Sequence, residues 1–310
     1  ARHHQVIVSV GVPTSKAVSN EDLKQTREGL MAMLKSLNLG VVEVGPEALI
    51  AVIDDLTSPT TAPQDDAVPY NPNDPIASQA IRHDIELVVA EDRMRLVTER
   101  FRPTGKVNDG VPEIGTVYPD AFDVRHFAVR NMPSRWAPWE CARLIGDLFT
   151  DKLRFPCPAA TMLCLVYPDQ EAASAKAGFK FMRTTSLAGT RSARFLPRIG
   201  EQAAEWQHVQ AELQEGRRLV RVFYGVTTYS PLGQGDRHER AIKSIYKAAG
   251  WDLTDERYLQ IQGLLAAMPL TLADGLGADM ERLKRFKTVL STTAANIAPM
   301  QGEYLGSAHP

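Results

Sequence analysis

The feature of this sequence that most constrains its fold is the alternation of short β-branched runs with segments of helical periodicity. The runs "HQVIVSVGVP" (4–13) and "RRLVRVFYGVTTYS" (217–230) have the composition of strands. Between such runs, apolar residues recur every three or four positions, as they do along one face of a helix. The alternation predicts an α/β or α+β fold: a mixed sheet with helices packed on it, split-βαβ or ferredoxin-like elements, and no phosphate-loop motor core.

Residues 1–80 are expected to form a small βαβ unit. The strand at 4–13 precedes a helix from about residue 20 to residue 38, and "LGVVEVG" (39–45) predicts a second strand. A short helix is expected in "EALIAVIDDL". Residues 57–78 contain five prolines and little apolar periodicity, which indicates a long loop or a mobile hairpin tip.

Residues 81–286 are expected to form the main body of the chain. Paired strands are predicted at 84–105 because apolar and polar residues alternate there. Residues 287–310 are expected to be a junction toward a further domain, since proline and glycine follow an alanine-rich run. The remaining predicted elements of the body are a strand at 120–133, a helix from Ala137 to Asp151, a strand from Ala159 to Tyr167, an interrupted helix from Gln170 to Glu215, the strand at 217–230, and helices from Asp236 to Ala249 and from about Glu256 to Ala267.

Composition and charge exclude several classes of protein. The net charge of the 310 residues is −2, so no chain-wide basic field favours nucleic acid or anionic lipid. Three cysteines are an odd number, which favours a reducing compartment over a disulfide framework. The longest apolar stretch, "CPAATMLCLVYP", falls well short of the ~20 residues needed to span a bilayer. We therefore expect a soluble, intracellular protein.

Common catalytic motifs are incomplete in this sequence. A phosphate loop requires G-x-x-x-x-G-K-[ST], and the Gly105-Lys106 pair lacks both the first glycine and the final Ser or Thr. In "PLGQGDRHE" the third glycine of a dinucleotide fingerprint is absent, so a turn followed by an Asp236 N-cap is the simpler interpretation. Cys157 and Cys164 are predicted to be core cysteines rather than metal ligands. No catalytic, cofactor-binding or metal-ligating residue is predicted.

Two groups of residues are candidates for contact with a partner. Arg217, Arg218 and Arg221 alternate with Phe223 and Tyr224, a pattern that can bind single-stranded nucleic acid but is more typical of an amphipathic strand with a solvated basic face. Trp136 and Trp139 precede a predicted helix and could anchor a partner, although core packing also accounts for them.

Longer stretches resemble a known family. The segment "RWAPWECARLIGDLFTDKLRFPCPAATMLCLVYPDQ", with its continuation "GFKFMRTTSLAGTRSARFLPRIGEQAAEW", resembles the TraC family of conjugation-associated ATPases in F-like type IV secretion systems. The strand "VFYGVTTYS" and the Gly250-Trp251 pair follow in the family's order. The segment "ADMERLKRFKTVLSTTAANIAPMQGEYLGS" looks like the connection to a RecA-like motor domain. The resemblance is strongest from about Phe122 to Gly306.

The resemblance implies a non-catalytic N-terminal docking and oligomerisation domain of a type IV secretion ATPase. ATP and Mg²⁺ are expected in a motor domain outside this chain, and no cofactor is expected within it. The implied partners are inner-membrane components of the secretion channel and further copies of the protein, in a hexameric parent at the cytoplasmic face of the inner membrane. Two alternatives remain open: a self-contained α/β enzyme with a scattered site, and a module that binds single-stranded nucleic acid.

Overall fold

Two long strands, β5 (Val117–Asn131) and β7 (Leu219–Pro231), form the centre of the sheet. They run antiparallel, with residues 122–128 opposite residues 225–231. Phe122–Val129 of β5 and most of β7 are buried on both faces of the sheet. Valine and aromatic residues dominate both strands, which suits strands that are covered on two sides.

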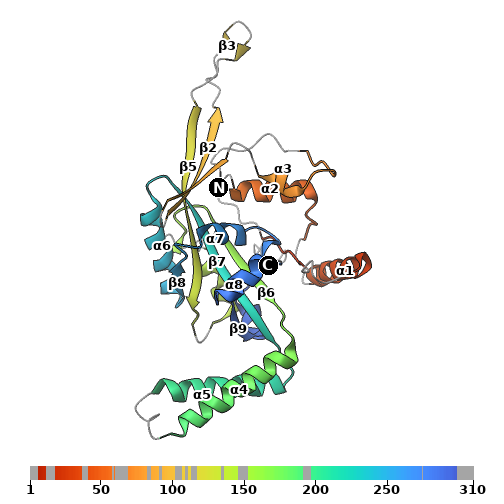
Figure 1. Cartoon of the computed structure of the whole chain (residues 1–310), viewed down its shortest axis with the longest axis vertical. Helices are drawn as coiled ribbons and strands as arrows, with labels where there is room; N and C mark the ends of the chain where they lie inside the picture. The colour runs from red at the N-terminus through yellow and green to blue at the C-terminus, as the bar shows by residue number, and fades with distance from the viewer. Residues whose placement is uncertain are drawn as a thin grey trace, which may run out of the picture.

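The structure, a computed structural model, is drawn in Figure 1. β5 and β7 are far apart in the sequence but pair in space, and the other elements pack on the sheet that they form. The described residues are 6–11, 18–36, 41–57, 59, 69–81, 85–90, 93–101, 107–108, 111–112, 117–133, 136–145, 153–190, 197–273 and 275–298.

Five further strands complete the sheet, which has the order β1-β2-β5-β7-β6 with two short additions. β8 pairs with β5 beyond the end of β2, and β9 pairs with β7 beyond the end of β5. Each described strand pair is antiparallel. A short ribbon of β3 and β4 stands apart from this sheet. The bounds are β1 (Ile85–Ala90), β2 (Arg93–Phe101), β3 (Val107–Asn108), β4 (Val111–Pro112), β6 (Ala159–Val166), β8 (Asp252–Asp255) and β9 (Lys287–Leu290).

One face of the sheet packs against the long helix α6 and two short helical segments. Tyr224 of β7, Tyr246 of α6 and Trp251 lie in this core, each at most 2% exposed. The hydroxyl of Tyr246 donates a hydrogen bond to the carbonyl of Leu144, 2.5 Å away. The covering elements are α6 (Gly235–Ala248), the 3-10 helix η1 (Pro138–Leu144) and α9 (Ser291–Asn296).

Shorter helices cover the opposite face. Val124 of β5, Tyr229 of β7 and Leu264 pack together there. The hydroxyl of Tyr229 donates to the carbonyl of Leu56, 2.8 Å away, which ties an N-terminal helix to the central strand. The elements on this side are α2 (Pro46–Thr57), the adjoining α3 (Ile76–Ala80), α7 (Gln260–Ala266), η4 (Thr271–Ala273) and α8 (Leu276–Arg282).

Three helices project from the sheet (Figure 1). α1 (Asn20–Ser36) buries only Leu34. α4 (Gln170–Ala188) and α5 (Pro197–Gln214) lie side by side as a hairpin between β6 and β7. We refer to α4 and α5 together as the helical hairpin. Its two helices contact the sheet at one end only (Figure 1).

The predicted α+β class is confirmed, but three details of the prediction are wrong. The strand pairs are antiparallel, whereas a mixed sheet was expected. Residues 6–11 and 41–45 form no strand, so the described part of the N-terminal segment is not a βαβ unit. Strand propensity fails there because neither run finds a neighbouring strand to pair with.

The third error concerns the limit of one helix. The helix expected at 137–151 is a 3-10 helix that ends at Leu144, and 146–152 lie outside the described residues. The role of 287–310 as a junction stays a prediction; its described part contains β9 and α9, and Ala294 and Ile297 lie in the main core. Much of the predicted loop at 57–78 lies outside the described residues, although α3 begins within it. The division of the chain at residue 80 stays a prediction.

Candidate functional site: a charged hollow beside β5

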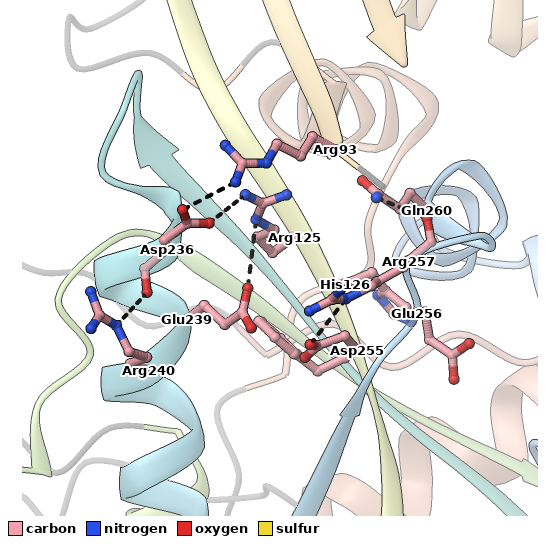
Figure 2. Close-up of a pocket in the computed structure, with 11 residues that line it drawn as sticks. Arg93, Arg125, His126, Asp236, Glu239, Arg240, Asp255, Glu256, Arg257 and Gln260 are labelled. Atoms are coloured by element: carbon pink, nitrogen blue, oxygen red, sulfur yellow. Dashed lines mark hydrogen bonds and ion pairs between the residues drawn. The ribbon is translucent and has the colours of Figure 1, made fainter. Parts of the chain in front are cut away.

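A hollow lies where β2 and β8 leave a gap along one edge of β5. β2 pairs with β5 up to Val124, and β8 begins to pair at Phe127. The gap therefore falls at Arg125 and His126. It opens into a hollow of about 330 Å³ that is lined by side chains of β2, β5, α6, β8 and α7 (Figure 2).

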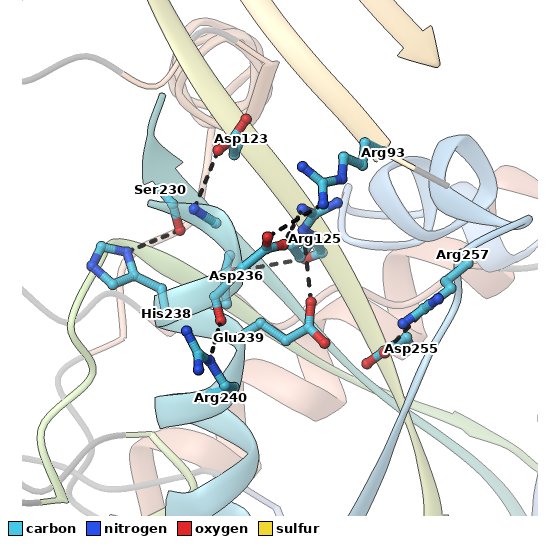
Figure 3. A network of polar contacts seen from close by, with 12 residues as sticks. Arg93, Asp123, Arg125, Ser230, Asp236, His238, Glu239, Arg240, Asp255 and Arg257 are labelled. Carbon is cyan, nitrogen blue, oxygen red and sulfur yellow. Dashed lines mark hydrogen bonds and ion pairs between the residues drawn. The ribbon is translucent and has the colours of Figure 1, made fainter. Parts of the chain in front are cut away.

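Arg125 is the central cation of this hollow. Alternation along β5 directs its side chain to the face that α6 covers, where it is 9% exposed. Its Nη2 donates to Oδ1 of Asp236 at 3.0 Å, and its Nε lies 3.8 Å from Oε2 of Glu239 (Figure 3). Asp236 also accepts from Arg93 of β2 at 3.3 Å. Asp236 lies in the first turn of α6, where the helix dipole stabilises a carboxylate.

A second cation, Lys243, joins α6 to β8. Its ammonium pairs with Asp255 and lies 3.0 Å from Glu239. Burial by itself would lower the pKa of Lys243, but hydrogen bonds to Asp255 and Glu239 outweigh that effect and raise it. The ammonium also lies 5.8 Å from the ring centroid of Phe127, within cation–π range. Lys243 therefore stays charged and holds two carboxylates of different elements together.

Asp123 of β5 supports the turn that leads into α6. Its Oδ2 accepts hydrogen bonds from the backbone amides of Gly233 (2.8 Å) and Gly235 (3.2 Å). The φ of Gly233 is 81°, which glycine adopts at little cost. The turn predicted for "PLGQGDRHE" is therefore correct, but the predicted Asp236 cap is wrong. Gln234 is the N-cap, and Asp123 supplies the acceptor from another strand.

His126 borders the hollow from the opposite face of β5. It is 3% exposed, and its Nδ1 lies 2.9 Å from Oγ1 of Thr227. Burial lowers its pKa to about 3, so the imidazole is neutral at physiological pH. A Cβ on Gly263 of α7 would lie 2.1 Å from Cγ of His126, so α7 can approach β5 only through a glycine. His126 is a packing residue for α7 and is not poised for proton transfer near neutral pH.

The electrostatic balance of the hollow favours a structural role. Each of its carboxylates on α6 and β8 has a cationic partner, and Glu256 likewise pairs with Arg285 at 2.7 Å. Such mutual pairing reduces the net charge that the hollow offers to a phosphate or a metal ion. Within the described part of the chain, no group of three or more His, Cys, Asp or Glu residues could hold a metal. The network positions α6 and β8 on β5.

Comparison with known proteins shows the family of this chain. A family model described as TraC protein matches residues 1–272. The chain belongs to the TraC family. It is 20% identical over 312 residues to Protein TraC of Escherichia coli (strain K12), in an alignment that covers 96% of this chain and 33% of that protein. The chain thus spans about a third of the length of this curated relative.

Membership of the TraC family confirms the resemblance and indicates a component of conjugative type IV secretion. None of the described helices of this TraC-family chain is long and apolar enough to cross a membrane.

Trp136, one of the two tryptophans predicted to contact a partner, packs against the core of the TraC-family fold. Trp136 is half-buried and packs edge-on against Trp251, with ring centroids 5.3 Å apart. Trp139 belongs to η1, but its side chain lies outside the described residues. Partner contact by these two residues stays a prediction.

The three candidate arginines are not gathered into one basic surface. Arg217 and Arg218 precede β7 and are exposed, and Arg217 lies 3.7 Å from Glu212. Arg221 is half-buried and pairs with Glu281 of α8. The aromatic residues that would have to stack on bases, Phe223 and Tyr224, are at most 2% exposed. These buried rings cannot stack on bases, as binding of single-stranded nucleic acid would require.

The charged network itself was not predicted. Its members come from five elements, and their spacing along the chain carries no signal because the sheet brings them together. One local clue was present: "DVRH" (123–126) alternates charged and apolar residues within an otherwise apolar strand. A buried strand with charges on one face requires partners on the element that covers that face.

Proposed function

We propose that this chain is the non-catalytic N-terminal docking and oligomerisation domain of a type IV secretion ATPase. The observation that carries the proposal is the family match over residues 1–272, in a chain that spans a third of its longer relative. The parent protein energises pilus assembly and substrate transfer, and its ATP- and Mg²⁺-dependent motor lies in another part of the protein.

The composition of the hollow supports a non-catalytic role. Arg125 is engaged by Asp236 and Glu239 of α6, and His126 is neutral and buried. The sequence contains no phosphate-loop motif that could hold ATP. These observations favour a rigid scaffold around β5 and β7 rather than a reaction centre.

The projecting elements support a docking role. α1 and the helical hairpin extend away from the sheet, and large apolar residues such as Phe179 (65%) and Met182 (63%) are exposed on the hairpin. Exposed apolar side chains on a protruding element are typical of interaction surfaces. The proposed partners are further copies of the protein and inner-membrane components of the secretion channel, which would hold the protein at the cytoplasmic face of that membrane.

Two measurements on the 310-residue chain, one on the purified protein and one in cells, test this proposal. Calorimetric titration with Mg-ATP is expected to give no saturable heat, with the full-length parent protein as the positive control. In cells that carry the secretion system, the chain is expected to co-sediment with inner membranes, and in cells without the system it is expected to stay in the supernatant. Saturable ATP binding by the chain at micromolar concentration contradicts the proposal, as does membrane association that is independent of the secretion system.

A further inference from the structure

The helical hairpin has two faces that its own packing does not use. Its inner faces meet in a small apolar cluster that includes Ala177 of α4 and Trp206 of α5, and Lys180 lies 5.3 Å from the ring centroid of Trp206. α4 buries only Ala177, and no described residue of α5 is buried. The described residues on the outward faces of both helices are exposed.

The outward face of α4 is apolar and basic. Exposed residues recur at the three- and four-residue spacing of one helix face, from Ala172 through Ala175 and Phe179 to Met182. Phe179 is 65% exposed and Met182 is 63% exposed. The exposed cations Lys176 and Arg183 flank this row. We call this surface the α4 outer face.

The outward face of α5 has the complementary character. Alanines and glutamates, with one histidine, are exposed there at three- and four-residue intervals. Alanines at this spacing leave shallow depressions that could receive a large side chain, while glutamates beside them offer negative charge. We call this surface the α5 outer face. Its members are Glu201, Ala204, Glu205, His208 and Ala211.

The charged residues of the two outer faces have no described ion-pair partner within one copy of the chain. Among the residues that the structure describes, Lys176 and Arg183 form no ion pair, and neither do Glu201 and Glu205. By contrast, Glu212 nearer the sheet pairs with Arg217. The unpaired basic and acidic faces therefore lie on opposite sides of the same narrow hairpin.

We propose that the α4 outer face binds the α5 outer face of a second copy of this chain. This inference rests on the self-assembly in the proposed function and names the surface that would carry it. Phe179 and Met182 would pack over Ala204 and Ala211. If the helices cross in the antiparallel register of the hairpin itself, Arg183 comes opposite Glu201 and Glu205.

The contact is heterologous, because each copy uses one face to bind its neighbour and keeps the other face free. Head-to-tail contacts of this kind build a ring when the rotation closes and a filament when it does not. Each added copy would continue one layer of antiparallel helices, α4-α5-α4-α5. The charge arrangement also opposes pairing of two α4 faces, since that would bring cations together.

Charge reversal tests the proposal by sedimentation equilibrium of the 310-residue chain. One variant carries Lys176→Glu and Arg183→Glu on α4, and the other carries Glu201→Lys and Glu205→Lys on α5. Each variant alone is expected to associate at least roughly tenfold more weakly than the wild type, because its two faces then carry like charges. The matched control, Lys247→Glu with Lys284→Glu at exposed positions away from α1 and the hairpin, is expected to associate like the wild type.

Mixing the variants gives the decisive result. An equimolar mixture is expected to associate again, because each α4 face meets an α5 face of opposite charge. Phe179→Ala, which changes no charge, is expected to weaken association of the wild-type sequence by roughly 30-fold, as loss of a buried aromatic anchor does. Circular dichroism of every variant checks that the hairpin remains folded.

Several outcomes would overturn the inference. The inference is wrong if the wild-type chain stays monomeric at its highest soluble concentration. It is also wrong if the equimolar mixture of the α4 and α5 variants fails to associate. Binding of the wild type to phosphatidylglycerol vesicles that is lost in the α4 variant, without self-association, would assign the α4 face to a lipid surface instead. Either result leaves the ATP and membrane-recruitment tests of the proposed function unaffected, so the two failures are distinguishable.

Discussion

Large apolar side chains are buried in the sheet around β5 and β7, whereas they are exposed on the helical hairpin. In the sheet, Phe223, Tyr224 and Trp251 are each at most 2% exposed. In the hairpin, Phe179 and Met182 are each more than 60% exposed. The sheet is therefore held by its own core, whereas the hairpin keeps apolar surface available for another molecule. The comparison separates a scaffold from an interaction element within one chain.

Charged residues show the same contrast. Arg125 is almost fully buried, and it pairs with Asp236 and Glu239 of another element. On the outer faces of the hairpin, Lys176 and Glu201 are exposed and form no described ion pair. Charges in the sheet fix the packing of its elements, and charges on the hairpin are free to select a partner.

The sharpest test of this contrast is the loss of an aromatic side chain from each region. Trp251→Ala is expected to lower the free energy of unfolding by about 4 kcal/mol, because it leaves a large cavity in the main core. Phe179→Ala is expected to change it by less than about 0.5 kcal/mol, since the side chain is mostly solvated. Urea unfolding followed by circular dichroism measures both values. Similar losses for the two variants would contradict the comparison.

Glycine substitutions extend the test to the backbone. Gly263→Ala is expected to destabilise the fold by about 3 kcal/mol, because the new methyl group would collide with the base of the His126 side chain. Gly200→Ala in α5 meets no atom within 4 Å and is expected to stabilise the chain by up to about 1 kcal/mol through helix propensity. Opposite signs in thermal unfolding are the expected result. Destabilisation by Gly200→Ala would show that the hairpin surface is more constrained than its exposure indicates.

Removing a cation from each region compares their ion pairs. Arg125→Met is expected to cost about 2.5 kcal/mol, because Glu239 and Asp236 lose their buried partner. Arg217→Met, which removes an exposed pair with Glu212, is expected to cost less than about 0.5 kcal/mol. Equilibrium unfolding at low and at high salt distinguishes the two, since only the exposed pair is strongly screened. Equal costs would mean that Arg125 is better solvated than the structure shows.

Acid titration should affect the sheet through His126. The folded protein keeps this imidazole neutral down to about pH 3, whereas the unfolded chain takes up a proton near pH 6.5. Unfolding therefore binds a proton between these values, and stability falls as the pH is lowered. The expected loss is about 2 kcal/mol at pH 5 relative to pH 7.

The variant His126→Gln serves as the control for this titration. It is expected to have a smaller pH dependence, whatever its stability at pH 7. Some slope should remain, because burial and the nearby Arg237 also lower the pKa of His238. An unchanged slope in His126→Gln would rule out His126 as the titrating group.

Local patterns predicted the elements whose sequence signal is long and periodic. The strands at 84–105, 120–133, 159–167 and 217–230 and the interrupted helix at 170–215 are confirmed in the structure. Periodicity succeeds there because each segment packs an apolar face against its neighbours, even in the hairpin, where most of that face is only partly buried. It fails at 6–11 and 41–45, where the β-branched residues have no strand to pair with. It also fails at β8 and β9, because a run of four residues is too short to show a period.

By itself the sequence determined the α+β class, the order of the long elements, the family and the lack of a phosphate loop. These depend on composition, periodicity and short motifs, which are local properties. Only the tertiary structure decided that β2 and β8 share one edge of β5, that Asp123 caps a helix more than a hundred residues away, and that the two outer faces of the hairpin are left uncovered. Such contacts join residues distant in the chain, and their energies depend on burial and register that no local pattern records.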